Sequence, residues 1–282
     1  MVGAIIGDII GRQFEGLEFK SKKFELFTDR CAPTDDSFMT LAVAKALLLT
    51  SRLGYSDDRL RSACVACMKE IANAHKDTLW GNKFYKWLFE RSYPYESFGN
   101  GAAMRISPVG WVADSEEEVK RLARAVTDIS HNHPEGLKGG EAMAMAVYLA
   151  RIGTPKEEIR RRMEEYYPRI KTMTINGIRP FYGYDEYGDY MSCQGSLPEA
   201  LVAFFDGEDF EDTIRNALSI GGDADTLGAM AGSVAEAYYG VPAWIEEGAL
   251  KYLSEDLLNV YYAFNTIKRA RKNRNMQKET GK

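Results

Sequence analysis

The sequence predicts an all-α protein. Apolar residues recur at helical spacing in about ten segments, several of which begin with capping residues and are joined by short links. No stretch of any length alternates apolar and polar residues, as a half-buried strand does. Because such helices must bury their apolar faces against one another, we expect one all-α domain over residues 1–270, followed by a basic tail over residues 271–282.

The composition limits the class of protein. The 282 residues are enough for one large core, and 45% hydrophobic with 27% charged residues is ordinary for a globular chain. The formal net charge of -5 argues against a general binder of nucleic acid or of anionic membranes. No uncharged apolar run reaches the roughly 18 residues of a membrane span. The apolar N-terminal segment has no basic region before it, and Asp8 interrupts it. We therefore expect a cytoplasmic protein that does not enter a membrane.

The first expected helix, over residues 2–13, has a stripe of glycines. Gly3, Gly7 and Gly11 fall on one face, and this spacing lets another backbone approach closely. Asp8 lies in the same apolar segment, and we interpret it as a structural carboxylate or as a partner of residues that bind a ligand. The stripe therefore predicts tight packing between two helices.

The remaining helices follow from apolar runs, caps and breakers. Ser115 opens one capping box, and Thr154 opens another with Pro155 at the first helical position. The expected helices cover 36–51, 56 through 69 or beyond, 102–106, 115–128, 136–151, a charged helix from 154, 197–205, 210–219, a small-residue helix after 226, a short helix from 242 and a longer one over 250–270. Two segments lack helical spacing. The aromatic stretch 75–98 is interpreted as a long connection that can wall a flat ligand, and 168–195 as a surface loop with room for a short strand.

Two of these helices begin with an unusual number of side-chain oxygens. The first group is Thr34, Asp35 and Asp36, and the second is Asp223, Asp225 and Thr226, which follow the double glycine Gly221-Gly222. A plain N-cap needs one such oxygen. For either segment taken alone, a helix cap with surplus oxygens would be as good an explanation as a ligand site. Clustered carboxylate and hydroxyl oxygens suit Mg²⁺, Ca²⁺ or Mn²⁺. Adjacent like charges repel and a shared cation relieves the repulsion, so we hypothesise that both helix starts meet around one or two hard cations.

Other candidate residues are weaker when taken alone. The turn Gly99-Asn100-Gly101 precedes a helix, and consecutive backbone N–H groups at such a start suit phosphate, although many glycine-rich turns bind nothing. His131 is more often a satisfied polar residue than a ligand, and Glu15 is more often a solvated helix end. The pair Cys64 and Cys67 has metal-like spacing without a second pair or a nearby histidine, which favours core packing over zinc or redox chemistry.

Six short blocks resemble those of the ADP-ribosylglycohydrolases, and they occur in the family's order over most of the chain. The two metal motifs of that family resemble Thr34-Asp35-Asp36-Ser37 and Gly222-Asp223-Ala224-Asp225-Thr226. The other matching blocks are Gly3 to Glu15, Ser97 to Arg105, Ser130-His131, and Tyr238-Tyr239-Gly240. The family fold is a compact, orthogonally packed all-α domain, in agreement with the helical pattern.

The resemblance implies a substrate, a cofactor and a set of site residues. The bond cut is at the anomeric carbon of the distal ribose of ADP-ribose, and the family uses two divalent cations, most often Mg²⁺ and sometimes Mn²⁺. The implied metal ligands are Thr34, Asp35, Asp36, Asp223, Asp225 and Thr226. The implied catalytic residues are Glu15, Asp35 and Asp36, with Glu15 as acid or base. The implied substrate-binding residues are Ser97, Phe98, Gly99, Asn100, Gly101 and His131.

Two other classes of protein stay open. One is a non-catalytic ADP-ribose binder or structural relative, against which the intact ligand oxygens and Glu15 argue. The other is an all-α isoprenoid synthase, which needs carboxylates one helical turn apart, whereas Ser37, Phe38 and Met39 follow Asp36. The ADP-ribosylated partner is a protein or a small molecule, a nucleic-acid acceptor is not excluded, and the sequence does not determine the acceptor or the oligomeric state.

Overall fold

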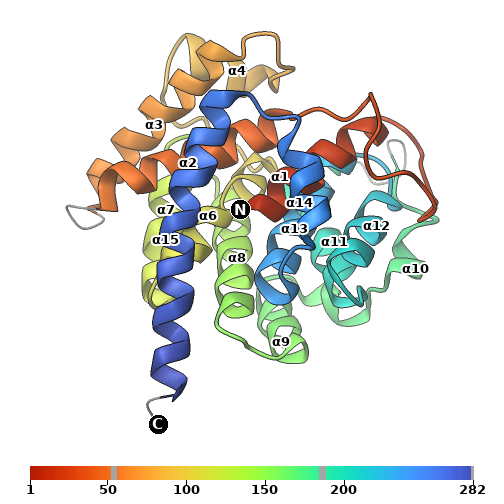
Figure 1. Cartoon of the computed structure of the whole chain (residues 1–282). Helices are drawn as coiled ribbons and strands as arrows, with labels where there is room; N and C mark the ends of the chain where they lie inside the picture. Colours follow the sequence, from red (N-terminus) through yellow and green to blue (C-terminus); the bar gives the residue numbers. More distant parts are fainter. Residues whose placement is uncertain (52–55, 184–188, 281–282) are drawn as a thin grey trace.

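Helix α1 (Val2–Gly11) lies at the centre of the molecule and is buried along its whole length (Figure 1). The structure is a computed structural model. It describes the backbone of residues 1–51, 56–183 and 189–280, and the side chains within these ranges as far as residue 267. Within these ranges the chain forms helices and one isolated bridge, between Gly99 and Ser192, and no strand. The all-α prediction is confirmed.

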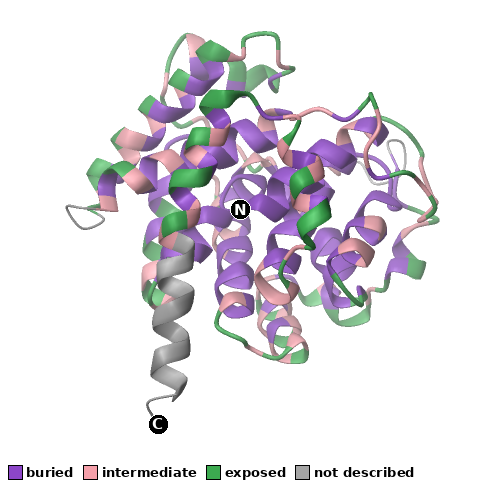
Figure 2. Cartoon of the chain, viewed as in Figure 1, coloured by how far each residue is buried: buried purple, intermediate pink, exposed green. Residues whose placement is uncertain are grey.

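The helices follow one another with short links. Their bounds are α1 Val2–Gly11, η1 Arg12–Phe14, α2 Asp35–Thr50, α3 Asp57–Ala74, α4 Asn82–Phe89, α5 Gly101–Met104, α6 Ser107–Val112, α7 Glu116–Thr127, α8 Pro134–Arg151, α9 Lys156–Tyr166, η3 Pro168–Thr172, α10 Ile175–Ile178, α11 Cys193–Phe205, α12 Phe210–Leu218, α13 Ala224–Tyr239, α14 Ala243–Leu250 and α15 Glu255–Thr280. Buried residues fill the central helices, while much of α3 and α4 is exposed (Figure 2).

The glycine stripe of α1 packs directly against the backbone of α13. A Cβ atom placed on Gly7 would lie 1.9 Å from the Gly228 carbonyl oxygen, and one on Gly3 would lie 2.0 Å from that of Gly232. At Gly11 the Cβ would lie 2.5 Å from the Cα of Asp225. Real Cβ atoms do not approach other atoms so closely, so each of these positions requires glycine. The predicted close approach is confirmed, and its partner is the helix that carries the second oxygen-rich motif.

Four local predictions differ from the structure. The 75–98 connection contains the amphipathic helix α4, whose Trp87 and Phe84 pack into the core. The predicted helix over 102–106 is the shorter α5, which ends at Met104, and a second short helix, α6, which the sequence did not predict, begins at Ser107. The 168–195 segment contains η3 and α10 in place of a strand, and residues 184–188 lie outside the described part. Pro155 is itself the N-cap of α9, so Thr154 lies before the helix and is not its capping residue.

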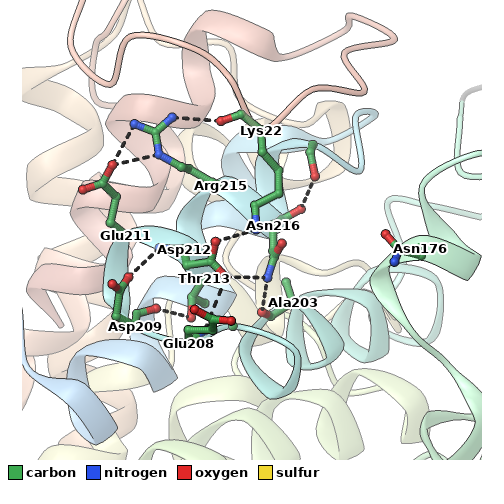
Figure 3. Close-up of polar contacts among 12 residues, drawn as sticks. Lys22, Asn176, Ala203, Glu208, Asp209, Glu211, Asp212, Thr213, Arg215 and Asn216 are labelled. Atoms are coloured by element: carbon green, nitrogen blue, oxygen red, sulfur yellow. Dashed lines mark hydrogen bonds and ion pairs between the residues drawn. The ribbon is translucent and has the colours of Figure 1, made fainter.

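Helix α12 holds the connector that runs from η1 to α2. Arg215 donates a hydrogen bond to the Lys22 carbonyl oxygen at 2.9 Å, and its guanidinium is held by Glu211 on the same helix at 2.8 Å (Figure 3). The Lys22 ammonium pairs in turn with Asp212. Because a cation with several fixed partners restrains the backbone that it touches, these contacts restrain the connector upstream of α2.

The four cysteines, Cys31, Cys64, Cys67 and Cys193, are free and buried. Cys64 and Cys67 pack in the apolar core, and burial raises the pKa of both thiols, the pKa of Cys67 to about 11. The prediction of core packing at this pair is confirmed. Among the described helices, none combines the length and the apolar composition that a bilayer crossing needs. The basic tail predicted for residues 271–282 lies beyond the described side chains and stays a prediction.

The contact between α1 and α13 predicts a large effect of one methyl group. We expect Gly7→Ala to lower the free energy of unfolding by about 3 kcal/mol or more, because the new Cβ overlaps backbone that cannot move aside. Chemical denaturation followed by circular dichroism measures this. Gly81→Ala is the matched control, since nothing lies within 4 Å of its Cβ position, and it should change stability by less than about 1 kcal/mol. Equal stability of the two variants would contradict the packing.

Candidate functional site

The two oxygen-rich helix starts meet. Thr226, in the first turn of α13, donates a hydrogen bond to Asp36 Oδ2 at 3.2 Å, across 190 residues of sequence. Carboxylate oxygens of Asp8, Asp36 and Asp225 all lie within 4.8 Å of one another, and all three residues are buried. The structure therefore brings the first and the second motif to one place, as the sequence predicts, and adds Asp8 to the group.

Asp8 organises the first motif. Its Oδ2 accepts hydrogen bonds from the backbone N–H groups of Thr34 (2.9 Å) and Ser37 (3.0 Å), and its Oδ1 accepts one from the Thr34 hydroxyl (2.6 Å). These N–H groups belong to the start of α2, where helix donors have no partner within the helix. The Thr34 hydroxyl gives its only proton to Asp8 and accepts the capping hydrogen bond from the Asp36 N–H at 3.4 Å, which leaves one lone pair of its oxygen for another group.

The second motif is shaped by its glycines. Gly221 and Gly222 have φ values of 77° and 71°, which residues with a side chain rarely adopt. The Gly222 carbonyl oxygen accepts a hydrogen bond from the Gly16 N–H at 3.3 Å, so the end of η1 lies beside this turn. Asp223 is the N-cap of α13, yet its side chain makes no capping bond and instead accepts one from Asn100 Nδ2 at 2.6 Å. Its carboxylate therefore faces the other site residues and does not cap the backbone of its own helix.

The clustered carboxylates perturb one another. Burial is the main cause of a raised pKa at each one, and neighbouring carboxylates add to it. Burial, followed by the charges of Asp8 and Asp223, raises the pKa of Asp35 to about 8, and burial raises the pKa of Asp8 to about 6. The pKa values of Asp36 and Asp225 lie well above the usual range for the same reasons. The ionised cluster is therefore unfavourable unless positive charge compensates it.

The donor set fits hard divalent cations. The Oδ1 atom of Asp36 is buried and has no hydrogen-bond partner among the described residues, which is costly for a carboxylate oxygen without a ligand. The surrounding donors are carboxylate and hydroxyl oxygens, the ligand types that Mg²⁺ and Mn²⁺ prefer, with no thiol among them. The residues at the two helix starts therefore could hold such ions.

Glu15 lies at the rim of this cluster. Arg12 Nη1 donates to Glu15 Oε2 at 2.6 Å, and the Glu15 side chain is about one-third exposed. Burial raises the pKa of Glu15, the Arg12 charge opposes that change, and the Asp223 charge adds to it. A carboxyl group that is half-buried, reachable by solvent and next to the cluster has the position and the chemistry of a general acid or base.

A cavity of about 500 Å³ opens above the carboxylates. This volume is typical of small-molecule sites. Its lining includes Glu15, the carboxylates Asp35, Asp36, Asp223 and Asp225, the hydroxyl of Thr226, the aromatic residues Trp80, Phe84 and Tyr95, and Ser97, Gly99, Asn100, Gly101, Arg105, His131 and Met191. Two of the predicted site residues lie elsewhere: Phe98 is 40% exposed and packs against His133, and Thr34 lines a neighbouring cavity.

The glycine turn offers fewer backbone donors than the sequence suggests. The Gly99 N–H donates to Ser97 Oγ at 3.2 Å, and the Asn100 N–H donates to the Met191 carbonyl oxygen at 2.8 Å. Both are therefore already satisfied within the chain. Gly101, the first residue of α5, has no such acceptor among the described residues, so one N–H of this turn is left for a ligand.

His131 is held as a neutral hydrogen-bond donor to the cavity. Arg105 Nη2 donates to Ser130 Oγ at 2.7 Å, and Ser130 Oγ lies 2.8 Å from His131 Nδ1. Arginine can only donate, and Arg105 Nη2 lies 3.5 Å from Nδ1 as well as beside Ser130 Oγ, so Nδ1 is an acceptor and the serine hydroxyl donates to it. Nε2 then carries the imidazole hydrogen, and it points at Gly101, where a Cβ would lie 3.0 Å away. Burial, followed by the Arg105 charge, lowers the His131 pKa well below 6.5.

Sequence reasoning missed several residues of the site. The sequence interpretation of Asp8, as a structural carboxylate or as a partner of ligand-binding residues, agrees with its hydrogen bonds to Thr34, but it did not include the place of Asp8 in the carboxylate cluster itself. Arg105 lies four residues after Gly101, and the sequence does not indicate that this arginine is buried. Met191 comes from a segment without any pattern, so no sequence signal predicted it. The aromatic wall was anticipated as a property of residues 75–98, without its members.

Comparisons with known proteins agree with the family resemblance. The sequence model of a family described as ADP-ribosylglycohydrolase matches residues 1–275. ADP-ribosylhydrolase ARH3 of Gallus gallus is 25% identical, over 86% of this chain and 86% of that protein. ADP-ribosylarginine hydrolase Tri1 of Pseudomonas putida is 26% identical, over 88% of this chain and 73% of that protein. An uncharacterised protein of Archaeoglobus fulgidus is 29% identical, over 57% of each chain.

A solved structure has the same fold. It is titled "ADP-ribosylglycohydrolase-related protein complex" and superposes with a TM-score of 0.67 and 26% identity. The match covers 95% of this chain and 97% of the other. The likeness therefore extends over the whole helical domain and not only over the two motifs.

When no cations are bound, the carboxylate cluster should lower the free energy of unfolding, and the size of this effect should depend on pH. An acid whose pKa is higher in the folded state stabilises the fold only at low pH, and this stability is lost as the pH rises through the folded pKa. In EDTA at pH 8 we expect Asp36→Asn to melt higher than the parent, by roughly 2–4 °C for each kcal/mol gained. The difference should shrink as the pH falls, because the raised pKa of Asp36 lets the parent protonate this carboxylate at a higher pH than an ordinary aspartate. Differential scanning calorimetry measures both effects, and a lower melting temperature of the variant at pH 8 would contradict the charge repulsion.

His131 predicts a distinctive nuclear magnetic resonance signal. Between about pH 5 and 8, the range in which an ordinary histidine titrates, its ring nitrogens should keep the shifts of a neutral imidazole protonated at Nε2. The chain has three histidines, so His75→Gln and His133→Gln variants assign the peaks. A midpoint near 6.5, or a hydrogen on Nδ1, would show that Ser130 and Arg105 do not set the state of this ring.

Proposed function

Because the chain belongs to the ADP-ribosylglycohydrolase family, we propose that it hydrolyses the bond between the anomeric carbon of the distal ribose of ADP-ribose and an acceptor, with the help of divalent cations. The observation that carries the proposal is the meeting of two oxygen-rich helix starts at the floor of a 500 Å³ cavity. The acceptor is an ADP-ribosylated protein or small molecule, linked through nitrogen or oxygen.

The cations would be held by the residues of both helix starts. The proposed ligands are Thr34, Asp35, Asp36, Asp223, Asp225 and Thr226, and two Mg²⁺ ions are the preferred occupants, with Mn²⁺ as the alternative. When bound, such ions would fix the ribose hydroxyls and supply positive charge next to the reacting carbon. Asp8 would act on this site by orienting the hydroxyl of Thr34 and the N-terminal turn of α2.

The protein's own groups would bind and orient the sugar nucleotide. His131 Nε2–H and the Gly101 N–H would donate to the diphosphate or ribose oxygens, and the aromatic residues Trp80, Phe84 and Tyr95 would cover the flat parts of the ligand. Holding the anomeric carbon next to the carboxylates raises the effective concentration of the reacting groups. Glu15 would move the proton, either from the attacking water or to the leaving acceptor oxygen or nitrogen.

A non-catalytic ADP-ribose binder is the alternative function. It would need the cavity but neither Glu15 nor the cation ligands. Glu15 lines the same cavity as Asp35, Asp36, Asp223 and Asp225, which supports hydrolysis over binding alone. An isoprenoid synthase is set aside, because the chain belongs to a different family.

Release of ADP-ribose from a panel of modified acceptors tests the proposal and the role of Glu15 together. We expect turnover with Mg²⁺, loss in EDTA and recovery when Mg²⁺ returns. Glu15→Gln should lower kcat by about 10²–10⁴-fold, the usual share of a general acid or base, and leave the Kd for ADP-ribose nearly unchanged. Glu18→Gln is the matched control, since this carboxylate lines neither the cavity nor the cluster. Binding of ADP-ribose without release from any acceptor would support the non-catalytic alternative.

A further inference from the structure

A cavity of about 520 Å³ lies between α3 and α7, and the proposed function gives it no role. The segment after α4 and the start of α8 complete its walls, and we call it the α3–α7 cavity. None of its lining residues lines the 500 Å³ cavity above the carboxylates. The two cavities are neighbours along the chain, because Pro94 and Asn132 line the first while Tyr95 and His131 line the second. The volume of the α3–α7 cavity is typical of a small-molecule site.

Two charged residues of the α3–α7 cavity neutralise each other. Arg61 on α3 donates from Nε to Asp128 Oδ1 at 3.0 Å and from Nη2 to Asp128 Oδ2 at 2.8 Å. Its third nitrogen, Nη1, donates at 3.3 Å to Asp58, which does not line the cavity. All three nitrogens of this guanidinium are therefore engaged within the chain, and both oxygens of Asp128 are paired.

Two hydrogen-bond donors at the cavity are still available. Arg124 on α7 is exposed, and its guanidinium has no acceptor among the described residues. Asn132 Oδ1 accepts a hydrogen bond from the Glu96 N–H at 2.7 Å, which identifies the oxygen end of this amide. Its Nδ2 is therefore held in place, and no acceptor faces it in the described part of the chain. A cation and a fixed amide donor thus line one cavity.

The charges and the apolar lining determine which ligand fits. Because Arg61 and Asp128 cancel, the cavity has one uncompensated positive charge, that of Arg124. A monocarboxylate matches this charge, and its two oxygens match the fork of a guanidinium. A phosphate monoester carries more negative charge than Arg124 can balance and would face Asp128. Aliphatic surface for the rest of the ligand comes from Val65, Pro94, Ile129 and Leu137.

We propose that the α3–α7 cavity is a second ligand site, which binds a small organic acid with one carboxylate and a short aliphatic body. The Arg124 guanidinium would hold the carboxylate, Asn132 Nδ2 would donate a further hydrogen bond to it, and the aliphatic residues would cover the body. This site goes beyond the proposed function and does not depend on it.

Three probes with one cyclohexyl body and different head groups test the proposal: cyclohexanecarboxylate, cyclohexanecarboxamide and cyclohexyl phosphate. The protein is first stripped of cations with EDTA and dialysed, so that no metal at the carboxylate cluster captures a probe. Isothermal titration calorimetry should give the lowest Kd for the carboxylate. The Kd for the carboxamide should be about tenfold higher or more, because a charge-assisted hydrogen bond is roughly twice as strong as a neutral one.

Substitutions and nuclear magnetic resonance locate the bound probe. Arg124→Gln should raise the Kd for the carboxylate by about tenfold or more. Asn132→Asp keeps the oxygen that accepts from Glu96 and replaces the donor by an anion, so it should weaken binding as well. Arg121→Gln is the matched control, since this exposed arginine of α7 pairs with Asp57 and does not line the cavity. Methyl signals of Val65, Ile129 and Leu137 should shift with the carboxylate, and melting curves verify that each variant is folded.

The outcomes are distinct. Binding of the carboxylate that shifts these methyl signals and is lost in Arg124→Gln, but not in Arg121→Gln, supports the site. No binding at millimolar concentration, or equal Kd values for the parent and a folded Arg124→Gln variant, overturns it. A carboxamide that binds as tightly as the carboxylate would show that the cavity does not select an anion. Tighter binding of cyclohexyl phosphate would show that the assigned class of ligand is wrong.

Discussion

The backbone contact between α1 and α13 is the constraint on which the site depends. Gly7 and Gly228 meet without side chains between them, so the two helices lie as close as their backbones permit. Asp8 follows Gly7 directly, and Asp225 precedes Gly228 by less than one helical turn. The glycines therefore determine the separation of two buried carboxylates. A larger residue at either position would move Asp8 from the start of α2 and pull the first motif away from the second.

Because the buried carboxylates lie so close together, the site without bound cations lowers the stability of the fold. Buried carboxylates that raise one another's pKa do not stabilise a fold at neutral pH, and an unpartnered oxygen on Asp36 adds to that cost. The surrounding helices supply the stability that this arrangement requires, since α1 and α13 are buried on almost every face. Strain of this kind is typical of a site that is completed by a ligand, and cations would convert the repulsion into binding energy.

The cavity walls show how a few long-range contacts assign roles to common residues. Ser130, Arg105 and His131 form a hydrogen-bonded series that leaves one ring N–H directed at the glycine turn. Asn100 connects that turn to Asp223 in the second motif. These contacts connect the glycine turn and His131 to the carboxylate cluster within one cavity.

The sequence alone determined the helical class, the close-packed glycine face of α1 and the two oxygen-rich helix starts, because each depends on residues within a few positions of one another. Only the tertiary structure decided that Asp8 joins the cluster and that α4 interrupts the aromatic connection. It also decided that the N–H groups of Gly99 and Asn100 donate hydrogen bonds within the chain. The physical reason is that these features are pairings between segments far apart in the chain, such as Asn100 with Asp223, and their geometry is set by how helices pack and not by local pattern.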